Sequence, residues 1–177
     1  FSLLYGCGSE TAVDKSTTIT GTAADGYLRG AKVCLDINEN GVCETAEPQD
    51  ITIVGGVYVI TVAPGIDIDK PLLVEVSAQT VDEDDGKLVG KPYVMKAPAG
   101  KHQFVSPITT LVQQEIENNP ALSAADAETK VKSALSMVDD TEVSLFDDFV
   151  AKQKSDANKE KYTDLHKTAR VIAALIA

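Results

Sequence analysis

The chain has 177 residues, of which 44% are apolar and 24% charged. That composition is typical of a folded globular protein with one or two domains. Its 27 acidic and 16 basic residues give a net charge of −11. Because contacts to phosphate need a basic face, this charge excludes nucleic acid as a partner. No apolar run approaches the roughly 18 residues that a membrane span requires.

The chain opens with a short apolar run that ends in a small residue and a cysteine, Leu4-Tyr5-Gly6-Cys7. Such a run is typical of the tail of a signal peptide. It resembles the lipobox of bacterial lipoproteins, although Tyr5 is larger than the residue usual at its position there. In that family the cysteine carries a lipid, so we expect residues 1–16 to be a signal-peptide tail, lipobox and tether, with Cys7 lipidated. The alternative is an irregular N-terminus with an unpaired thiol.

The chain contains three cysteines, Cys7, Cys34 and Cys43, and an odd count leaves one unpaired in an exported protein. If Cys7 carries lipid, Cys34 and Cys43 remain as a pair. A disulfide between them would require an oxidising compartment such as the periplasm. The alternative is two reduced, buried thiols.

Residues 17–105 are typical of short strands separated by turns. Apolar and polar residues alternate in several segments, and clusters of Gly, Pro and Asp lie between them. The expected strands cover 17–22, 31–35, 51–53, 57–62, 72–76 and 91–95. This pattern predicts an antiparallel β-sandwich of prealbumin-like or immunoglobulin-like type.

From Ser106 onward the apolar spacing becomes helical. Ser106 and Pro107 suit the N-cap and first position of a helix over 107–118. The pairs Ser123 with Asp126 and Ser144 with Asp147 resemble capping boxes at the start of two further helices. A last helix from about Asp156 is expected to bury Tyr162, Leu165, Ala169, Ile172, Ala173 and Ile176. The fold class is therefore α+β, with a small helical region over 106–177 that we expect to continue past Ala177.

One segment, residues 36–47, has the spacing of a twelve-residue calcium loop. Oxygen-bearing side chains occupy its first, third and fifth positions, and Gly41 stands at the sixth, where such loops turn sharply. Calcium prefers six to eight oxygen ligands, and alternate residues of a curling loop supply them. The predicted ligands are Asp36, Asn38, Asn40, the carbonyl of Val42, Glu44 through water, and Glu47.

Asp, Asn and Gly also favour turns, so the alternative for this segment is a hairpin turn without an ion. A strand, rather than a helix, is expected immediately before Asp36. The sequence therefore favours a calcium loop on a β-domain over the paired helices of an EF-hand. A bond between Cys34 and Cys43 would pinch the loop and orient its ligands.

The segment from Gly26 to Asp36, the loop itself, Glu47-Pro48 and Gly56–Ile60 together carry a resemblance. They are similar to the calcium-binding B-type repeats of bacterial surface adhesins and to carboxypeptidase-regulatory-like domains. Both are prealbumin-like sandwiches, which act as stalks, spacers or adhesion modules. With Ser106-Pro107-Ile108-Thr109-Thr110-Leu111, the chain also resembles uncharacterised lipoproteins of Gram-negative bacteria.

Two other sets of residues were considered as sites. The acidic run Asp82–Asp85 either binds a weak second ion or, more simply, forms a solvated turn. His102 and His166 have no ligand partner at metal spacing, and neither a nucleophile elbow nor a phosphate-binding loop occurs in the sequence. We therefore expect no enzyme activity from this chain.

Two functions remain as expectations. The first is a calcium-binding lipoprotein of a Gram-negative cell envelope, on the periplasmic or the surface side, which acts as a structural, binding or adhesion module. Lipid on Cys7 would hold it to the membrane, and a surface protein or polysaccharide would be its ligand. The second is an N-terminal accessory module of a longer secreted enzyme.

Overall fold

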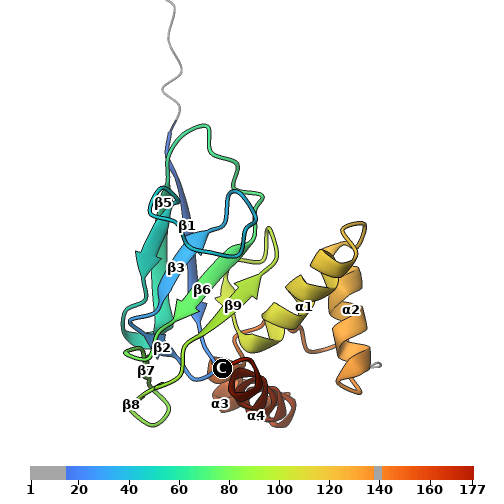
Figure 1. Cartoon of the computed structure of the whole chain (residues 1–177). Coiled ribbons are helices and arrows are strands. Elements are labelled where there is room, and N and C mark those ends of the chain that lie inside the picture. Colours follow the sequence, from blue (N-terminus) through green and yellow to red (C-terminus); the bar gives the residue numbers. More distant parts are fainter. Residues whose placement is uncertain (1–14, 138–140) are drawn as a thin grey trace, which may run out of the picture.

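The computed structural model describes residues 15–137 and 141–177. Within them, strands occupy the first part of the chain and four α-helices the second (Figure 1). The strands form three sheets, so the fold class is α+β, as the sequence predicts. The expected helical region follows the strands along the chain. Cys7 and the rest of segment 1–14 lie outside the described residues.

The first sheet is built around β1 (Thr17–Ala23), whose β-branched residues favour extended backbone. β1 pairs antiparallel with β5 (Val57–Val62), from Thr17 opposite Val62 to Thr22 opposite Val57. On its other side β1 pairs with the short β10 (Phe104–Val105), and this pairing is parallel. The expectation of a purely antiparallel arrangement is therefore wrong at this edge, because β10 enters after a long excursion of the chain.

The second sheet has the order β4-β3-β6-β9 and is antiparallel throughout. Its strands are β4 (Gln49–Ile51), β3 (Lys32–Leu35), β6 (Leu72–Val76) and β9 (Tyr93–Ala97). A third, small sheet joins β2 (Leu28–Arg29), β7 (Val81–Asp82) and β8 (Lys87–Leu88). A short 3-10 turn, η1 (Val54–Gly56), leads into β5.

One apolar core takes residues from both of the first two sheets. Alternate residues of β5 point into it, namely Tyr58, Ile60 and Val62, while their neighbours face outward. Alternate residues of β3 and β9 meet them from the other sheet. This period of two is what the sequence alternation predicts, because successive strand residues point to opposite faces.

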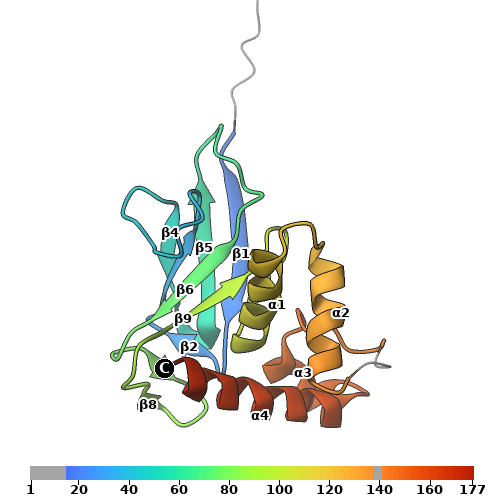
Figure 2. The same cartoon turned by 45° about the vertical axis from the view of Figure 1, so that its right-hand side comes forward.

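The helices are α1 (Pro107–Asn118), α2 (Ala124–Ala134), α3 (Phe149–Ser155) and α4 (Lys159–Ile176). They enclose a second apolar core together with Phe104 of β10. The ring of Phe149 meets Phe104 edge-on, with centroids 4.9 Å apart. Figure 2 shows α4 running beneath the other helices and on under the ends of the strands. Its Ala173 packs into the first apolar core, so α4 touches both cores.

Ser106 joins the strands to the helices. Its hydroxyl accepts a hydrogen bond from the amide of Thr109, and the hydroxyl of Thr109 accepts one from the amide of Ser106, which completes a capping box at α1. The Thr109 hydroxyl also lies 2.7 Å from the carbonyl oxygen of Lys96 on β9. Ser106 and Thr109 are fully buried, so these bonds fasten α1 to the sheet away from water.

Three expected helix features differ from the structure. The third helix begins after Asp148, whose carboxylate accepts from the amide of Ala151, and not at Ser144. Ser144 instead donates to Glu128 of α2, a tertiary contact that local spacing does not reveal. The last helix begins at Lys159 rather than near Asp156. Ile176, expected to be buried, is 41% exposed.

Two strands are displaced by two residues from their expected ranges. The expected strand over 51–53 is β4 at Gln49–Ile51, and that over 91–95 is β9 at Tyr93–Ala97. In the second case Pro92 lacks the amide hydrogen that a strand inside a sheet donates, so regular pairing starts after it.

Replacing Thr109 with valine should destabilise the fold while preserving its shape. The change leaves the buried amide of Ser106 and the carbonyl of Lys96 without this partner, which costs about 1–3 kcal/mol. Thermal unfolding should show a midpoint several degrees lower. Thr129→Val, at an exposed position of α2, is the matched control, since its hydroxyl also donates to a backbone carbonyl. An equal loss in both variants would contradict this role for Thr109.

Candidate functional site

The candidate loop, residues 36–47, connects β3 to β4 and begins directly after the strand residue Leu35. Its two end residues are charged and nevertheless buried, Asp36 at 2% exposure and Glu47 at 6%. Carboxylates are stable in such surroundings only when they are paired or hydrogen-bonded. The hydrogen bonds of these two residues therefore define the loop.

Backbone amides hold both buried carboxylates. Asp36 Oδ1 accepts from the amide of Asn40 at 3.0 Å, and Oδ2 accepts from the amide of Gly41 at 2.9 Å. Glu47 Oε1 accepts from the amide of Ile37 at 2.8 Å, and Oε2 from the amide of Glu44 at 3.0 Å. Each carboxylate oxygen can accept more than one bond. The loop therefore fixes two negative groups and leaves them able to bind further.

Asn38, Asn40 and Glu44 meet between these ends. The side-chain amides of Asn38 and Asn40 donate to the two oxygens of the Glu44 carboxylate, at 3.0 and 3.2 Å. Their carbonyl oxygens accept from the amides of Asn40 and Val42. The structure thus joins the five side chains predicted as ligands in one hydrogen-bonded loop. Val42 belongs to the same loop, and its side chain is 52% exposed.

Gly41 permits the turn at the centre of the loop. Its φ is +77°, in the left-handed region that favours glycine, and Glu39 nearby has a φ of +57°. The left-handed turn brings the amides of residues 40 and 41 back onto Asp36. This is the role that the sixth position of a calcium loop requires.

The loop supplies oxygen donors of two kinds, carboxylates and amides, with a backbone carbonyl at Val42. Hard cations such as calcium prefer this mixture. Among residues 15–137 and 141–177, no three His, Cys, Asp or Glu side chains are grouped as a metal site. The side-chain and carbonyl donors proposed for the loop are all oxygen atoms, and such a donor set fits calcium better than zinc or copper.

A disulfide fastens the loop to the sheet. Cys34 and Cys43 are bonded, as one of the two sequence interpretations predicted, and they pack against Leu73 on the face opposite the main core. The amide of Cys43 also donates to Glu75, and its carbonyl accepts from Lys32. The interpretation as two reduced thiols is therefore wrong for this structure.

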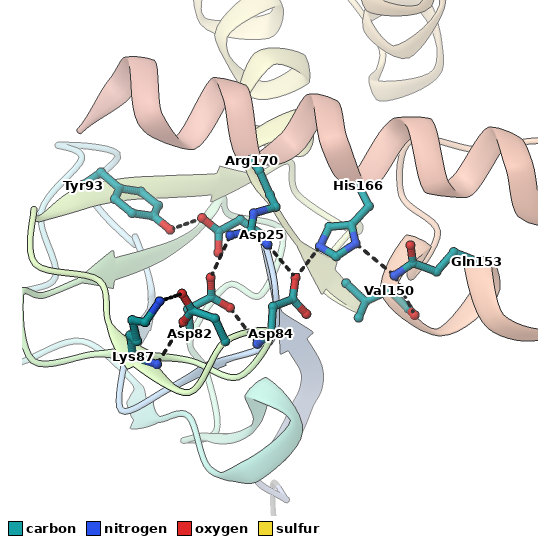
Figure 3. A network of polar contacts seen from close by, with 10 residues as sticks. Asp25, Asp82, Asp84, Lys87, Tyr93, Val150, Gln153, His166 and Arg170 are labelled. Atoms are coloured by element: carbon teal, nitrogen blue, oxygen red, sulfur yellow. Dashed lines mark hydrogen bonds and ion pairs between the residues drawn. The ribbon is translucent and has the colours of Figure 1, made fainter.

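A second group of polar side chains joins α4 to the strands, and Figure 3 shows it. We call it the α4 cluster; its members are Asp25, Asp82, Asp84, Tyr93, His166 and Arg170. Arg170 lies 3.3 Å from Asp84 and 3.7 Å from Asp82. His166 Nε2 lies 2.9 Å from Asp84, and its Nδ1 lies 2.9 Å from the side-chain nitrogen of Gln153. These contacts attach α4 to the β7–β8 hairpin.

Asp25 is a member of the α4 cluster whose buried carboxylate is only partly hydrogen-bonded. Its Oδ2 accepts from the hydroxyl of Tyr93 at 2.6 Å, and its buried Oδ1 has no hydrogen-bond partner among the described residues. Burial raises the pKa of Asp25, and the nearby Asp82 carboxylate raises it further. Burial also raises the pKa of Tyr93. The native protein therefore holds the proton of Asp25 more tightly than the unfolded chain does.

Sequence spacing does not predict the α4 cluster; it predicts either an ion site or a solvated turn at Asp82–Asp85. Asp82 and Asp84 instead face α4. Gly26 makes this possible, because a Cβ there would lie 2.3 Å from Asp82 Oδ1. The acidic run indicated a charged hairpin, but local spacing does not reveal that His166 and Arg170 lie opposite it.

His102 is a structural residue. It is buried at 7% exposure, and its Nε2 lies 2.9 Å from the carbonyl oxygen of Lys70. Its own carbonyl accepts from the hydroxyl of Tyr58. Burial lowers the pKa of His102, so the neutral form is favoured. These contacts hold the segment before β10 against β5.

No family model, curated protein or solved structure matches this chain. Among the described residues, the helices are too short or too polar to cross a bilayer.

Removing the disulfide should lower the free energy of unfolding. The bond closes a loop of ten residues, which corresponds to about 2.5–3 kcal/mol in the chain-entropy model. The double variant Cys34→Ala and Cys43→Ala should therefore unfold at a lower denaturant concentration than the wild type. Reductant should lower the unfolding midpoint of the wild type and leave that of the double variant unchanged. Equal midpoints for the oxidised wild type and the double variant would contradict this prediction.

Asp25→Asn should change stability in a pH-dependent way. Because the native state raises the pKa of Asp25, the native carboxyl holds its proton more tightly than the unfolded chain does. Its contribution to stability therefore falls as the pH rises from the ordinary value of 3.8 through the raised native value. We expect the variant to gain stability relative to wild type at pH 7, and this gain to shrink toward pH 4 in chemical unfolding.

Asp85→Asn serves as the control for this pH profile. The amide and ammonium of Lys87 hold the pKa of Asp85 below its usual range, so its contribution has the opposite sign and is lost as the pH falls. A difference between Asp25→Asn and wild type that stays constant from pH 4 to 7.5 would contradict a raised native pKa at Asp25.

Proposed function

We propose that this chain is a non-enzymatic calcium-binding module of the cell envelope of a Gram-negative bacterium. Its two larger sheets would form a prealbumin-like sandwich, which presents the calcium loop and carries the helical region. Lipid on Cys7 would anchor the protein to a membrane, with the domain on the periplasmic or surface side. A surface protein or a polysaccharide would be its ligand, in a structural, binding or adhesion role.

The observation that carries the calcium proposal is the burial of Asp36. An acidic side chain at 2% exposure is held by the amides of Asn40 and Gly41, at the far side of a left-handed turn. Glu47 is held in the same way eleven positions later. A turn without an ion needs neither two buried carboxylates nor Asn38, Asn40 and Glu44 gathered between them. This combination supports a cation site over a plain hairpin turn.

The disulfide supports the proposed location. Bonds of this kind persist in oxidising compartments and are rare in the cytosol, so Cys34–Cys43 agrees with export. Calcium is also abundant outside the cytosol, and extracellular modules typically bind it with dissociation constants of about 0.1–1 mM. In this proposal, the ion and the disulfide hold the same segment from its two sides.

When bound, calcium would supply positive charge to Asp36 and Glu47. The chain's own part is to present oxygen atoms in a fixed loop, with the disulfide holding Cys43 and backbone amides orienting the two carboxylates. Binding to the folded state alone stabilises that state. The expected consequence is a stiffer, more stable connection between β3 and β4.

The test is a thermal melt in excess chelator, in 10 mM calcium and in 10 mM magnesium. With the dissociation constants above, calcium should raise the free energy of unfolding by about 1.4–2.7 kcal/mol, which moves the midpoint by several degrees. Asp36→Asn keeps the shape of the side chain but removes its charge, and should abolish most of this shift.

Asp164→Asn is the matched control, because Asp164 is exposed on α4 and pairs only with a surface lysine in the contacts described. It should keep the wild-type response to calcium. A wild type with no calcium shift, or an Asp36→Asn variant with the full shift, would refute the proposed site.

A further inference from the structure

A small polar cavity separates the candidate calcium loop from helix α1. Its volume is about 160 Å³. The loop contributes Asp36, Asn40 and Gly41 to its walls, β9 contributes Lys96, and α1 contributes Gln113 and Glu117. The loop and the helical region therefore face one another here, although they are about 70 residues apart in the chain.

Lys96 is held in this cavity by contacts with α1 on both its backbone and its side chain. Its amide donates to the hydroxyl of Thr110, and its carbonyl accepts from the hydroxyl of Thr109. Its ammonium lies 2.9 Å from Glu117 Oε1, an oxygen that also accepts from Gln113. The side chain is 24% exposed, so the charge is partly shielded from water and its position is well defined.

The ammonium of Lys96 also lies next to the turn of the loop. It is 3.8 Å from the place that a Cβ on Gly41 would occupy. A positive charge there repels a cation bound by the loop, and partial burial reduces the screening of that repulsion by salt. Glu117 opposes the repulsion, because its carboxylate neutralises the lysine.

We propose that the Lys96–Glu117 ion pair sets the calcium affinity of the loop, with Lys96 lowering it and Glu117 raising it. This inference rests on the proposed calcium site. Because Glu117 belongs to α1, the calcium affinity of the loop depends on how α1 packs against the sheet. By linkage, bound calcium changes the strength of that attachment by the same factor.

The inference is tested by calorimetric calcium titration of the whole chain at low ionic strength. Lys96→Met removes the charge and keeps the apolar stem, and should tighten calcium binding about threefold. Glu117→Gln leaves the lysine uncompensated, and should weaken binding about twofold. Lys96→Arg keeps the charge and should bind calcium as the wild type does. Lys130→Met removes a lysine paired with Glu115, away from the cavity, and should leave binding unchanged.

The outcomes separate this inference from the proposed function. A wild type that binds no calcium refutes the calcium site itself. A wild type that binds calcium, with the same affinity in Lys96→Met and Glu117→Gln, refutes the role of the ion pair alone. An equal gain in Lys96→Arg and Lys96→Met would assign the effect to packing rather than charge, and would also refute it. Opposite shifts from Lys96→Met and Glu117→Gln support it.

Discussion

The cost of burying a carboxylate governs both polar sites of this protein. A negative group removed from water must find hydrogen-bond donors, a counter-charge or a proton. Asp36 and Glu47 find backbone amides, each donated by a residue that the loop has turned inward. Asp25 finds one hydroxyl and leaves its other oxygen without a partner among the described residues. The amide bonds of the loop hold Asp36 and Glu47 in place, whereas burial with a single hydrogen bond raises the pKa of Asp25.

That difference separates the loop, which is proposed to bind a cation, from the α4 cluster, which joins a helix to a hairpin. In the loop, the donors are neutral amides, so the negative charge of Asp36 and Glu47 remains available. In the α4 cluster, Arg170 and His166 already stand against Asp82 and Asp84. A further cation would have to displace them. The α4 cluster is therefore an attachment between helix and hairpin, even though it holds as many acidic residues as many ion sites.

Locality explains how much the sequence could predict. The proposed ligands of the loop lie within twelve residues, and Cys34 and Cys43 are nine positions apart, so spacing alone places them together. The alternation in β5 likewise follows from the strand period. By contrast, Tyr93 and Asp25 are 68 positions apart, and Arg170 meets Asp84 across 86. No periodic pattern specifies such contacts, because they depend on how segments far apart in the chain pack together.

The missed helix start shows the same limit on a smaller scale. Ser144 and Asp148 are both sound N-caps by local chemistry, and the chain uses Asp148 because Ser144 is engaged by Glu128 of another helix. At the proposed calcium site, Lys96 is likewise a residue from outside the local segment. The loop sequence specifies the oxygens proposed as ligands, but a lysine from β9 and a glutamate from α1 line the same cavity as the loop. If the proposal holds, the domain sets the affinity of the loop, and the same twelve residues placed on another sheet would bind calcium differently.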